Sequence, residues 1–290
     1  MIIEEIPVCF RIKKDNAYGI IHLPATYSKR GILIVVGGPQ YRVGSHRQFV
    51  LLGRYLARKG IPVMRFDYRG MGDSDGETHT FESIEDDIRA AIDEFFDQVT
   101  GLNDIAIWGL CDAASAASFY AHTDNRISGL VLLNPWVRTD SGMAKTYIKH
   151  YYFSRLFERN FWVKVIQGKF DVIKSIKSLA SMIITIFGFS NSKKNKNKSF
   201  QPDAESSPLP ERMYAGLNAY KGPLLFILSG DDITANEFRD AVKNSRAWQA
   251  LMNEPRVMTY ELADANHTYS KRAWRDQVAE WTLEWLQSGR

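Results

Sequence analysis

Short apolar runs alternate with helical patterns along most of this 290-residue chain. Gly31–Val36 is a continuous apolar run that ends before a glycine pair, as a buried strand does, and residues 46–59 then place apolar side chains at helical spacing. The alternation continues through a strand at Ile61–Phe66, a helix at Ser83–Val99 and a strand at Asp104–Trp108. Because this βαβα order requires crossover connections, it predicts a mainly parallel sheet with helices on both faces.

The alternation stops after Ile127–Leu133 and resumes at Pro223–Leu228. The residues between these two strands are first aromatic and basic, and then polar and proline-rich. An insertion between two strands of one sheet explains this change of character. We therefore predict an α/β core made of residues 1–135 and 218–290. Residues 136–217 are predicted to form a helical cap over the carboxyl edge of the sheet, where open α/β sheets bind ligands.

Local signals give the ends of several other elements. Ser83 is expected to be the N-cap of the helix that follows it, because a serine side chain accepts a hydrogen bond from the first turn. After the insertion, the patterns predict one helix near Ala235–Leu251, a strand at Val257–Leu262 and a last helix at Lys271–Gln287.

The charge balance and the cysteine count exclude several classes of protein. With 37 basic and 33 acidic residues, the formal net charge is +4, which is too mild to indicate a nucleic-acid-binding protein. Two cysteines, Cys9 and Cys111, do not make a disulfide framework and suit a reducing compartment. The chain does not open with a basic and then apolar segment, so we expect a cytoplasmic protein without a secretory signal.

The strongest functional signal is the segment around Cys111. An apolar strand runs into Gly109-Leu-Cys-Asp-Ala113, and small residues follow at helical spacing. This order is typical of a nucleophile elbow, a tight turn that requires small residues two before and two after the nucleophile. The helix N-terminus would favour a thiolate, whereas the neighbouring carboxylate of Asp112 would oppose it. We predict that Cys111 is a nucleophile and that Cys9, which lacks this context, is not.

Backbone N–H groups are the expected donors to an oxyanion. One would come from Asp112, directly after the nucleophile, and the other from the glycine pair that follows the strand at residues 31–36. Pro39 has no N–H and cannot donate. We therefore predict the N–H of Gly38 as the second donor, with Gln40 as the alternative.

A base and an acid follow later in the chain. The strand at Pro223–Leu228 leads into Ser-Gly-Asp231-Asp232, and a loop histidine, His267, follows the last predicted strand. Nucleophile, acid and histidine then occur in the chain order of an α/β-hydrolase triad. We predict that His267 is the general base and that Asp232 orients it, with Asp231 as the alternative. No group of residues has the spacing of metal ligands, so neither a metal nor a cofactor is expected.

A second glycine-rich turn, Phe66–Ser74, follows the strand at 61–66. Its glycines supply the positive φ that a sharp reversal needs, and Asp67 and Arg69 within it are expected to have structural roles. This turn, the elbow and the late Asp and His together resemble the α/β-hydrolase superfamily over nearly the whole chain except the cap.

A narrower resemblance rests on two segments, Gly37-Gly-Pro-Gln-Tyr-Arg42 and Gly109-Leu-Cys-Asp-Ala-Ala114. They look like the type-one hydrolase associated with exosortase A systems, a bacterial family encoded beside exopolysaccharide and protein-sorting genes. The resemblance implies that a cysteine nucleophile is a family trait, and that the triad is Cys111, Asp232 and His267. It implies a hydrolase-like activity and does not supply a substrate.

These residues predict an acyl hydrolase that forms a covalent acyl-thioester on Cys111. Thioesters and esters rank above peptides, because an amide leaving group demands more of the acid. The substrate is expected to be a small or lipid-like acyl compound. Three alternatives stay open: an acyltransferase with the same triad, a dienelactone-hydrolase-like enzyme, which would lack a large cap, and a non-enzymatic binding protein of the same fold, which would be expected to lose the acid or the base.

The predicted cap has two interpretations. Apolar residues recur at steps of three or four over residues 170–189, so one face of a helix could form the roof of the site. Alternatively, that face contacts a membrane interface on the cytoplasmic side, where Lys193, Lys194, Lys196 and Lys198 would each add about 1 kcal/mol of attraction to anionic lipid. The sequence does not indicate an oligomeric state.

Overall fold

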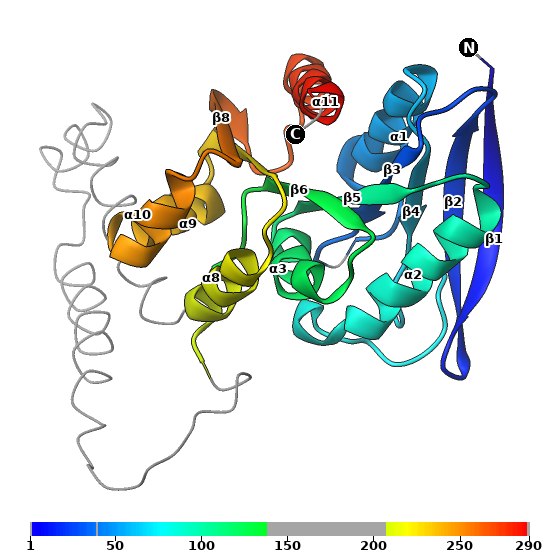
Figure 1. Ribbon diagram of the computed structural model, residues 1–290, viewed down its shortest axis with the longest axis horizontal. Helices are drawn as coiled ribbons and strands as arrows, with labels where there is room; N and C mark the ends of the chain where they lie inside the picture. Colours follow the sequence, from blue (N-terminus) through cyan, green and yellow to red (C-terminus); the bar gives the residue numbers. More distant parts are fainter. Residues whose placement is uncertain (1, 39, 138–206, 289–290) are drawn as a thin grey trace, which may run out of the picture. The chain divides into compact units, whose positions relative to one another are not determined.

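The computed structural model describes residues 2–38, 40–137 and 207–288. These residues form an eight-stranded sheet with the strand order β1-β2-β4-β3-β5-β6-β7-β8 (Figure 1). The strands are β1 (Ile3–Ile12), β2 (Asp15–Pro24), β3 (Arg30–Val35), β4 (Val63–Phe66), β5 (Asp104–Leu110), β6 (Ile127–Leu133), β7 (Leu224–Asp231) and β8 (Val257–Asn266). All pairs from β4 to β8 are parallel, whereas β1–β2 and β2–β4 are antiparallel. The predicted mainly parallel α/β sheet is confirmed.

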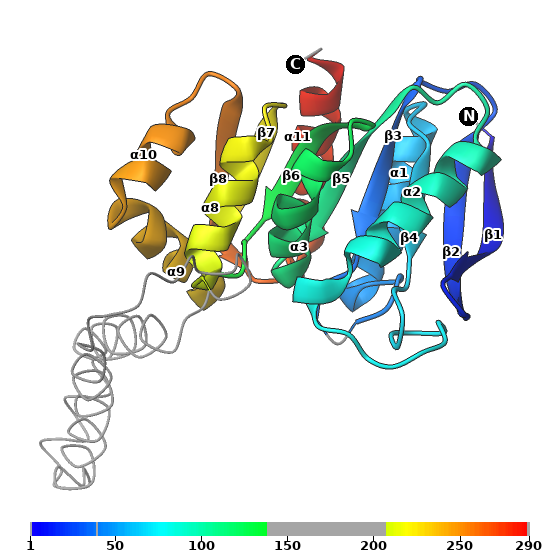
Figure 2. The same ribbon diagram turned by 60° about the horizontal axis from the view of Figure 1, so that its bottom comes forward.

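Helices cover both faces of the sheet. Side chains of α1 (Gln48–Arg58) and α11 (Arg272–Gln287) pack in the core on one face. The other face is covered by α2 (Glu85–Gln98), α3 (Asp112–Tyr120), α8 (Leu209–Ala219), α9 (Ile233–Lys243) and α10 (Arg246–Met252). Figure 2 shows α2, α3 and α8 side by side in front of the strands. Three short 3-10 helices, Ser45–Arg47, Phe81–Ser83 and Ala121–Thr123, complete the described helical segments.

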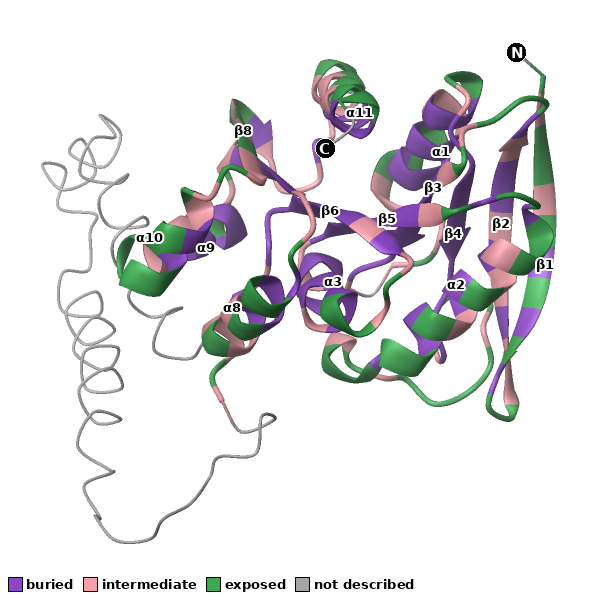
Figure 3. Cartoon of the chain, viewed as in Figure 1, coloured by how far each residue is buried: buried purple, intermediate pink, exposed green. Residues whose placement is uncertain are grey.

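The central strands are buried on both faces, which is why their sequences are continuous apolar runs (Figure 3). On β5, Ile105 and Ile107 point into the core beneath α2 and α3, whereas Ala106, Trp108 and Leu110 point into the core beneath α1 and α11. Burial of one such large apolar side chain contributes roughly 1.5–3 kcal/mol to folding. The two cores together fix β5, and therefore the turn that follows it, in the middle of the sheet.

Two local predictions are wrong. Ser83 does not cap α2: it lies in a 3-10 turn, its hydroxyl donates to the Thr80 carbonyl oxygen at 3.2 Å, and α2 begins after Ile84 without a side-chain cap. A serine side chain can bond to its own turn instead of the helix, and here it does. The single helix expected near Ala235–Leu251 is two helices: α9 ends at Lys243 with Asn244 as its C-cap, and Ser245 caps α10 by accepting from the N–H of Trp248.

The chain divides into two compact units, residues 1–137 with 210–290, and residues 138–209. The second boundary lies before the predicted residue 217, because α8 belongs to the sheet domain: Met213 and Leu217 are fully buried in its core. Most of the predicted cap, with its lysine tract, lies outside the described residues. Within the described ranges, no helix combines the length and the apolar character needed to cross a membrane.

Candidate active site

Cys111 lies in the turn between β5 and α3 with φ 65° and ψ −124°, a conformation that is costly for any residue other than glycine. The surrounding backbone holds it there: its N–H donates to the Leu133 carbonyl oxygen at 2.8 Å, and its carbonyl oxygen accepts from Trp136 at 3.2 Å. The half-buried thiol therefore stands at the carboxyl edge of the sheet, at the first turn of α3. Strain of this kind is characteristic of a nucleophile elbow.

The two small residues on either side of the predicted nucleophile, Gly109 and Ala113, are packed against each other. A Cβ atom on Gly109 would stand 2.7 Å from the carbonyl carbon and oxygen of Ala113, closer than real Cβ contacts come. Ala113 itself is fully buried. Only glycine fits at position 109 without opening the elbow.

His267 follows β8 in a loop whose position is fixed by Asn134. The Asn134 side-chain N–H donates to the His267 carbonyl oxygen at 3.1 Å. The His267 ring Nδ1 lies 2.9 Å from Oδ2 of Asp232, whose side chain is only 6% exposed. Asp232 also caps α9, accepting from Thr234 at 3.2 Å and Ala235 at 3.0 Å, so its carboxylate cannot rotate freely. Asp231, the alternative acid, is exposed at the end of β7.

A cavity of about 300 Å³ joins the predicted nucleophile, base and oxyanion loop. Cys111 and His267 both line it, whereas Asp232 lies behind the imidazole. The other lining residues are Gly37, Gly38, Gln40, Phe49, Phe81, Leu110, Asp112 and Trp136. Apart from Asp232 and its alternative Asp231, all the predicted site residues line this one cavity.

The predicted oxyanion donor Gly38 stands beside the elbow because of strand register. β3 and β5 pair in parallel with Val35 opposite Gly109, so the residues that follow each strand come together. The Gly38 N–H donates to Oδ2 of Asp112 at 2.9 Å. The N–H of Gln40, the alternative donor, is turned back to the Gly38 carbonyl oxygen at 2.8 Å. The sequence did not indicate that the Asp112 side chain would lie here.

Burial governs the ionisation of Asp112. It raises the pKa of the carboxyl group, against the opposing effects of the N–H groups of Gly38, Ala113 and Asp112 itself and of the nearby His267. The neutral acid is therefore favoured more than at an exposed aspartate.

A network of charged residues holds the loop that carries Gly38. Asp67 is fully buried, accepts from the backbone N–H of Arg42 at 2.5 Å and pairs with the Arg42 guanidinium. Arg65 donates to the Arg42 carbonyl oxygen at 3.0 Å. Arg69, in the same turn as Asp67, pairs with the buried Asp87 at 2.6 Å. Asp67 and Arg69 thus make structural contacts, and sequence reasoning missed Arg42 and Arg65 because their partners are distant in the chain.

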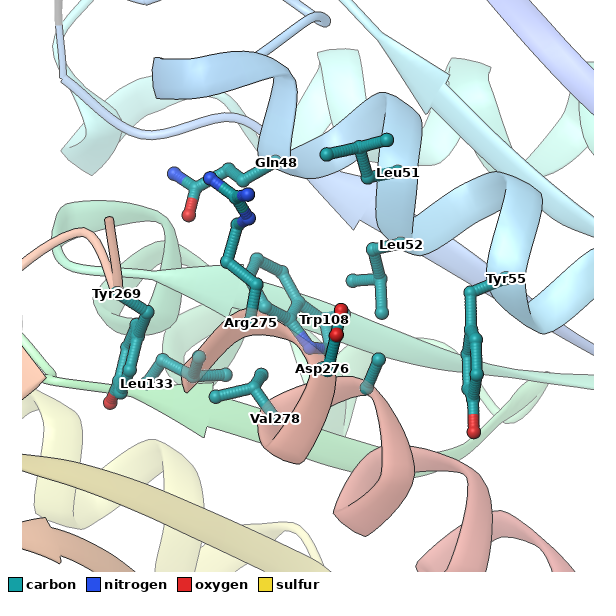
Figure 4. Close-up of a pocket in the computed structure, with 11 residues that line it drawn as sticks. Gln48, Leu51, Leu52, Tyr55, Trp108, Leu133, Tyr269, Arg275, Asp276 and Val278 are labelled. Carbon is teal, nitrogen blue, oxygen red and sulfur yellow. The ribbon is translucent and has the colours of Figure 1, made fainter. Parts of the chain in front are cut away.

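A second cavity, which Cys111 does not line, lies between α1 and α11 (Figure 4). It is lined by Trp108, Leu133 and Tyr269 from beneath and by Gln48, Leu52, Arg275 and other residues of the two helices. Its volume is about 50 Å³, which is room for roughly four water-sized groups. None of Cys111, His267 and Asp232 lines it, so the larger cavity at Cys111 is the better candidate for a substrate.

Residues 28–180, more than half of the chain, match the family described as serine aminopeptidase, S33. The chain belongs to this family of α/β hydrolases. The family name specifies a serine enzyme, whereas the elbow of this S33-family hydrolase carries Cys111. No curated protein matches the chain.

Solved structures share the fold of this S33-family hydrolase at low identity. An esterase from Pyrococcus furiosus is 16% identical with a TM-score of 0.65, covering 99% of this chain and 91% of its own. A dienelactone hydrolase from Anabaena variabilis is 12% identical with a TM-score of 0.60, covering 99% and 98%. The Butyrivibrio proteoclasticus protein Est1E, with ferulic acid bound, is 14% identical with a TM-score of 0.59, covering 97% and 98%. They establish the α/β-hydrolase fold.

Proposed function

We propose that the protein is an acyl hydrolase for esters or thioesters that works through a Cys111–His267–Asp232 triad. One observation carries the proposal: a cysteine in a strained elbow and a histidine paired to a buried carboxylate open onto the same cavity. A cysteine that only filled space would not need a positive φ, which costs on the order of 1–3 kcal/mol.

The reaction has two halves. His267 takes the thiol proton, the Cys111 sulfur attacks the acyl carbon, and the carbonyl oxygen becomes an oxyanion. The bond to the leaving alcohol or thiol then breaks as His267 returns the proton to it, which leaves an acyl-thioester on Cys111. Water attacks that thioester with His267 as base, and the carboxylic acid and the free thiol are released. Asp232 holds the imidazole with Nδ1 protonated throughout.

Backbone N–H groups would stabilise the oxyanion in both halves. The N–H of Asp112, at the first turn of α3, and the N–H of Gly38 are the proposed donors, and such a donor is worth roughly 3–4 kcal/mol in the transition state. The helix N-terminus also favours the thiolate form of Cys111. Thiolates attack thioesters and esters readily, so these bonds are the proposed substrates.

Intact-mass spectrometry after mixing with acyl thioesters of different chain length tests this proposal. Wild type should gain one acyl mass transiently, and Cys111→Ala should gain none. Cys9→Ala is the matched control, because it removes the exposed cysteine on β1 and should label like wild type. Adding an alcohol or a thiol in excess as a second acyl acceptor distinguishes the two reactions: a hydrolase releases the free carboxylic acid, whereas an acyltransferase forms the new ester or thioester. Failure of every thioester and ester to label Cys111 would contradict the proposal.

The exosortase association stays a prediction, since it concerns genomic neighbours. The same holds for the proposed membrane contact of the cap, whose lysines lie outside the described residues.

A further inference from the structure

The N–H group that an oxyanion would need is already in use. The Gly38 N–H donates to Oδ2 of Asp112 at 2.9 Å, a normal hydrogen-bond length. A substrate carbonyl oxygen and this carboxyl oxygen cannot both occupy the position in front of one N–H. Asp112 also lines the cavity that contains Cys111 and His267. The side chain therefore stands where the transition state must place its negative charge.

The packing of the other carboxyl oxygen is just as specific. Oδ1 of Asp112 is buried and has no hydrogen-bond partner among the described residues. A Cβ atom on Gly37 would stand 2.3 Å from this oxygen and 2.5 Å from the Leu110 carbonyl oxygen. Two acceptor oxygens therefore converge on the space that the missing side chain of Gly37 leaves free. Glycine at position 37 is what allows the carboxyl group to reach Gly38.

We propose that Asp112 is a plug of the oxyanion hole, whose carboxyl group occupies the Gly38 N–H in the resting enzyme and must rotate away before a substrate carbonyl can enter. This inference rests on the proposed function and adds a regulatory step to it. The half-buried side chain can rotate into the cavity of about 300 Å³ that it lines. The fraction of molecules with the plug open then limits the apparent rate of acylation.

Two substitutions should change the rate in opposite directions. Asp112→Ala removes the plug, and kcat/KM for a reactive thioester should rise by about tenfold or more, the population factor for one charge-assisted hydrogen bond. Asp112→Asn keeps the shape, and its amide can accept from Gly38 while donating toward the Leu110 carbonyl oxygen. Because this second hydrogen bond replaces the approach of two acceptor oxygens, Oδ1 and the Leu110 carbonyl oxygen, the variant should close the hole more tightly than aspartate does, and kcat/KM should fall by a similar factor.

The other outcomes each contradict the plug. Equal losses in both variants would mean that the carboxyl group is needed for catalysis or folding, and unchanged rates would mean that it leaves the hole freely. Thermal unfolding of both variants shows whether a loss is only a loss of fold.

The Gly38 amide provides a readout that does not depend on activity. In NMR spectra of 15N-labelled protein, the Gly38 amide proton should be shifted downfield and protected from solvent exchange in wild type and in Asp112→Asn. In Asp112→Ala it should show neither the downfield shift nor the protection. If no variant ever forms an acyl-enzyme, the proposed function fails while this signal still tests the plug. An identical Gly38 signal in wild type and Asp112→Ala would overturn the plug even in an active enzyme.

Discussion

The β1–β2 hairpin and the carboxyl edge of the sheet each bring a cysteine and a histidine into one region, Cys9 with His22 and Cys111 with His267, yet only the second pair has the geometry expected of a catalytic site. In the hairpin, Cys9 is exposed on a regular strand and His22 is fully buried against Arg65. At the carboxyl edge, Cys111 sits in a strained turn and His267 is half-buried beside Asp232. Residue type is the same in both regions. What differs is backbone conformation, access and the partner of the imidazole, and these decide the chemistry.

The largest expected effect comes from removing the proposed nucleophile. Cys111→Ala should lower kcat for ester or thioester hydrolysis by roughly 10⁴-fold or more, since the oxyanion hole alone supplies only residual catalysis. Cys9→Ala should leave kcat unchanged. Steady-state kinetics on both variants measures these effects. If the two substitutions change kcat to a similar extent, the proposed difference between Cys111 and Cys9 is wrong.

The next effect concerns Asp232, the proposed partner of the His267 imidazole. Asp232→Asn should lower kcat by about 10³-fold or more, because the amide no longer favours the tautomer with Nδ1 protonated. Asparagine still caps a helix well, so the stability conferred by α9 should change little. Asp231→Asn is the matched control, because Asp231 is exposed and precedes the cap. A loss in Asp231→Asn equal to that in Asp232→Asn would refute the assignment of the acid.

His22 should act on stability instead of activity. Its Nε2 accepts from Arg65 at 2.9 Å, and burial, helped by Arg65, lowers its pKa from 6.5 to about 4. The unfolded chain therefore binds the proton more tightly, and the folded state loses stability as pH falls from about 6.5 to about 4. Over this pH range, His22 should lower the free energy of unfolding by a total on the order of 3 kcal/mol.

Urea unfolding between pH 4 and 7 measures this contribution. The pH dependence should be smaller in His22→Gln than in wild type, and His122→Gln, at an exposed position, should behave like wild type. If His22→Gln keeps the full pH dependence, other groups cause it and His22 is not held neutral.

Much of the fold follows from local patterns, whereas the site's polar contacts do not. Continuous apolar strands and the Gly-x-Cys turn are sequence signals, and they predicted the sheet and the position of Cys111. The contact of Asp112 with Gly38 depends on which strands are neighbours and on the register that sets Val35 opposite Gly109. No single segment contains that information.

Helix ends and buried ion pairs were hard to predict for a related reason. Asn244 and Ser245 are residue types that helix ends favour, but the periodicity of the apolar side chains, on which the helix was predicted, does not reveal a break there. The contacts of Arg42 with Asp67 and Arg65 join residues more than twenty positions apart. Charged side chains do not reveal their partners in the sequence, because each is compatible with solvent as well as with a buried ion pair.

The smallest expected effect is in thiol reactivity, and it separates access from activation. If access alone governed alkylation, the exposed Cys9 would react with iodoacetamide before the half-buried Cys111. The helix N-terminus and His267 should instead favour thiolate at Cys111, which is the reactive form. We expect Cys111 to be alkylated about tenfold faster than Cys9 at pH 7, as measured by peptide mapping after brief exposure to iodoacetamide.

His267→Ala is the test of activation. It should reduce the ratio of the two alkylation rates, because it removes one group that favours the thiolate, while the Cys111 sulfur stays at least as accessible to the reagent. Faster reaction at Cys9 in wild type would mean that burial, or the neighbouring Asp112, outweighs the helix terminus, and that the resting thiol of Cys111 is kept unreactive until a substrate arrives.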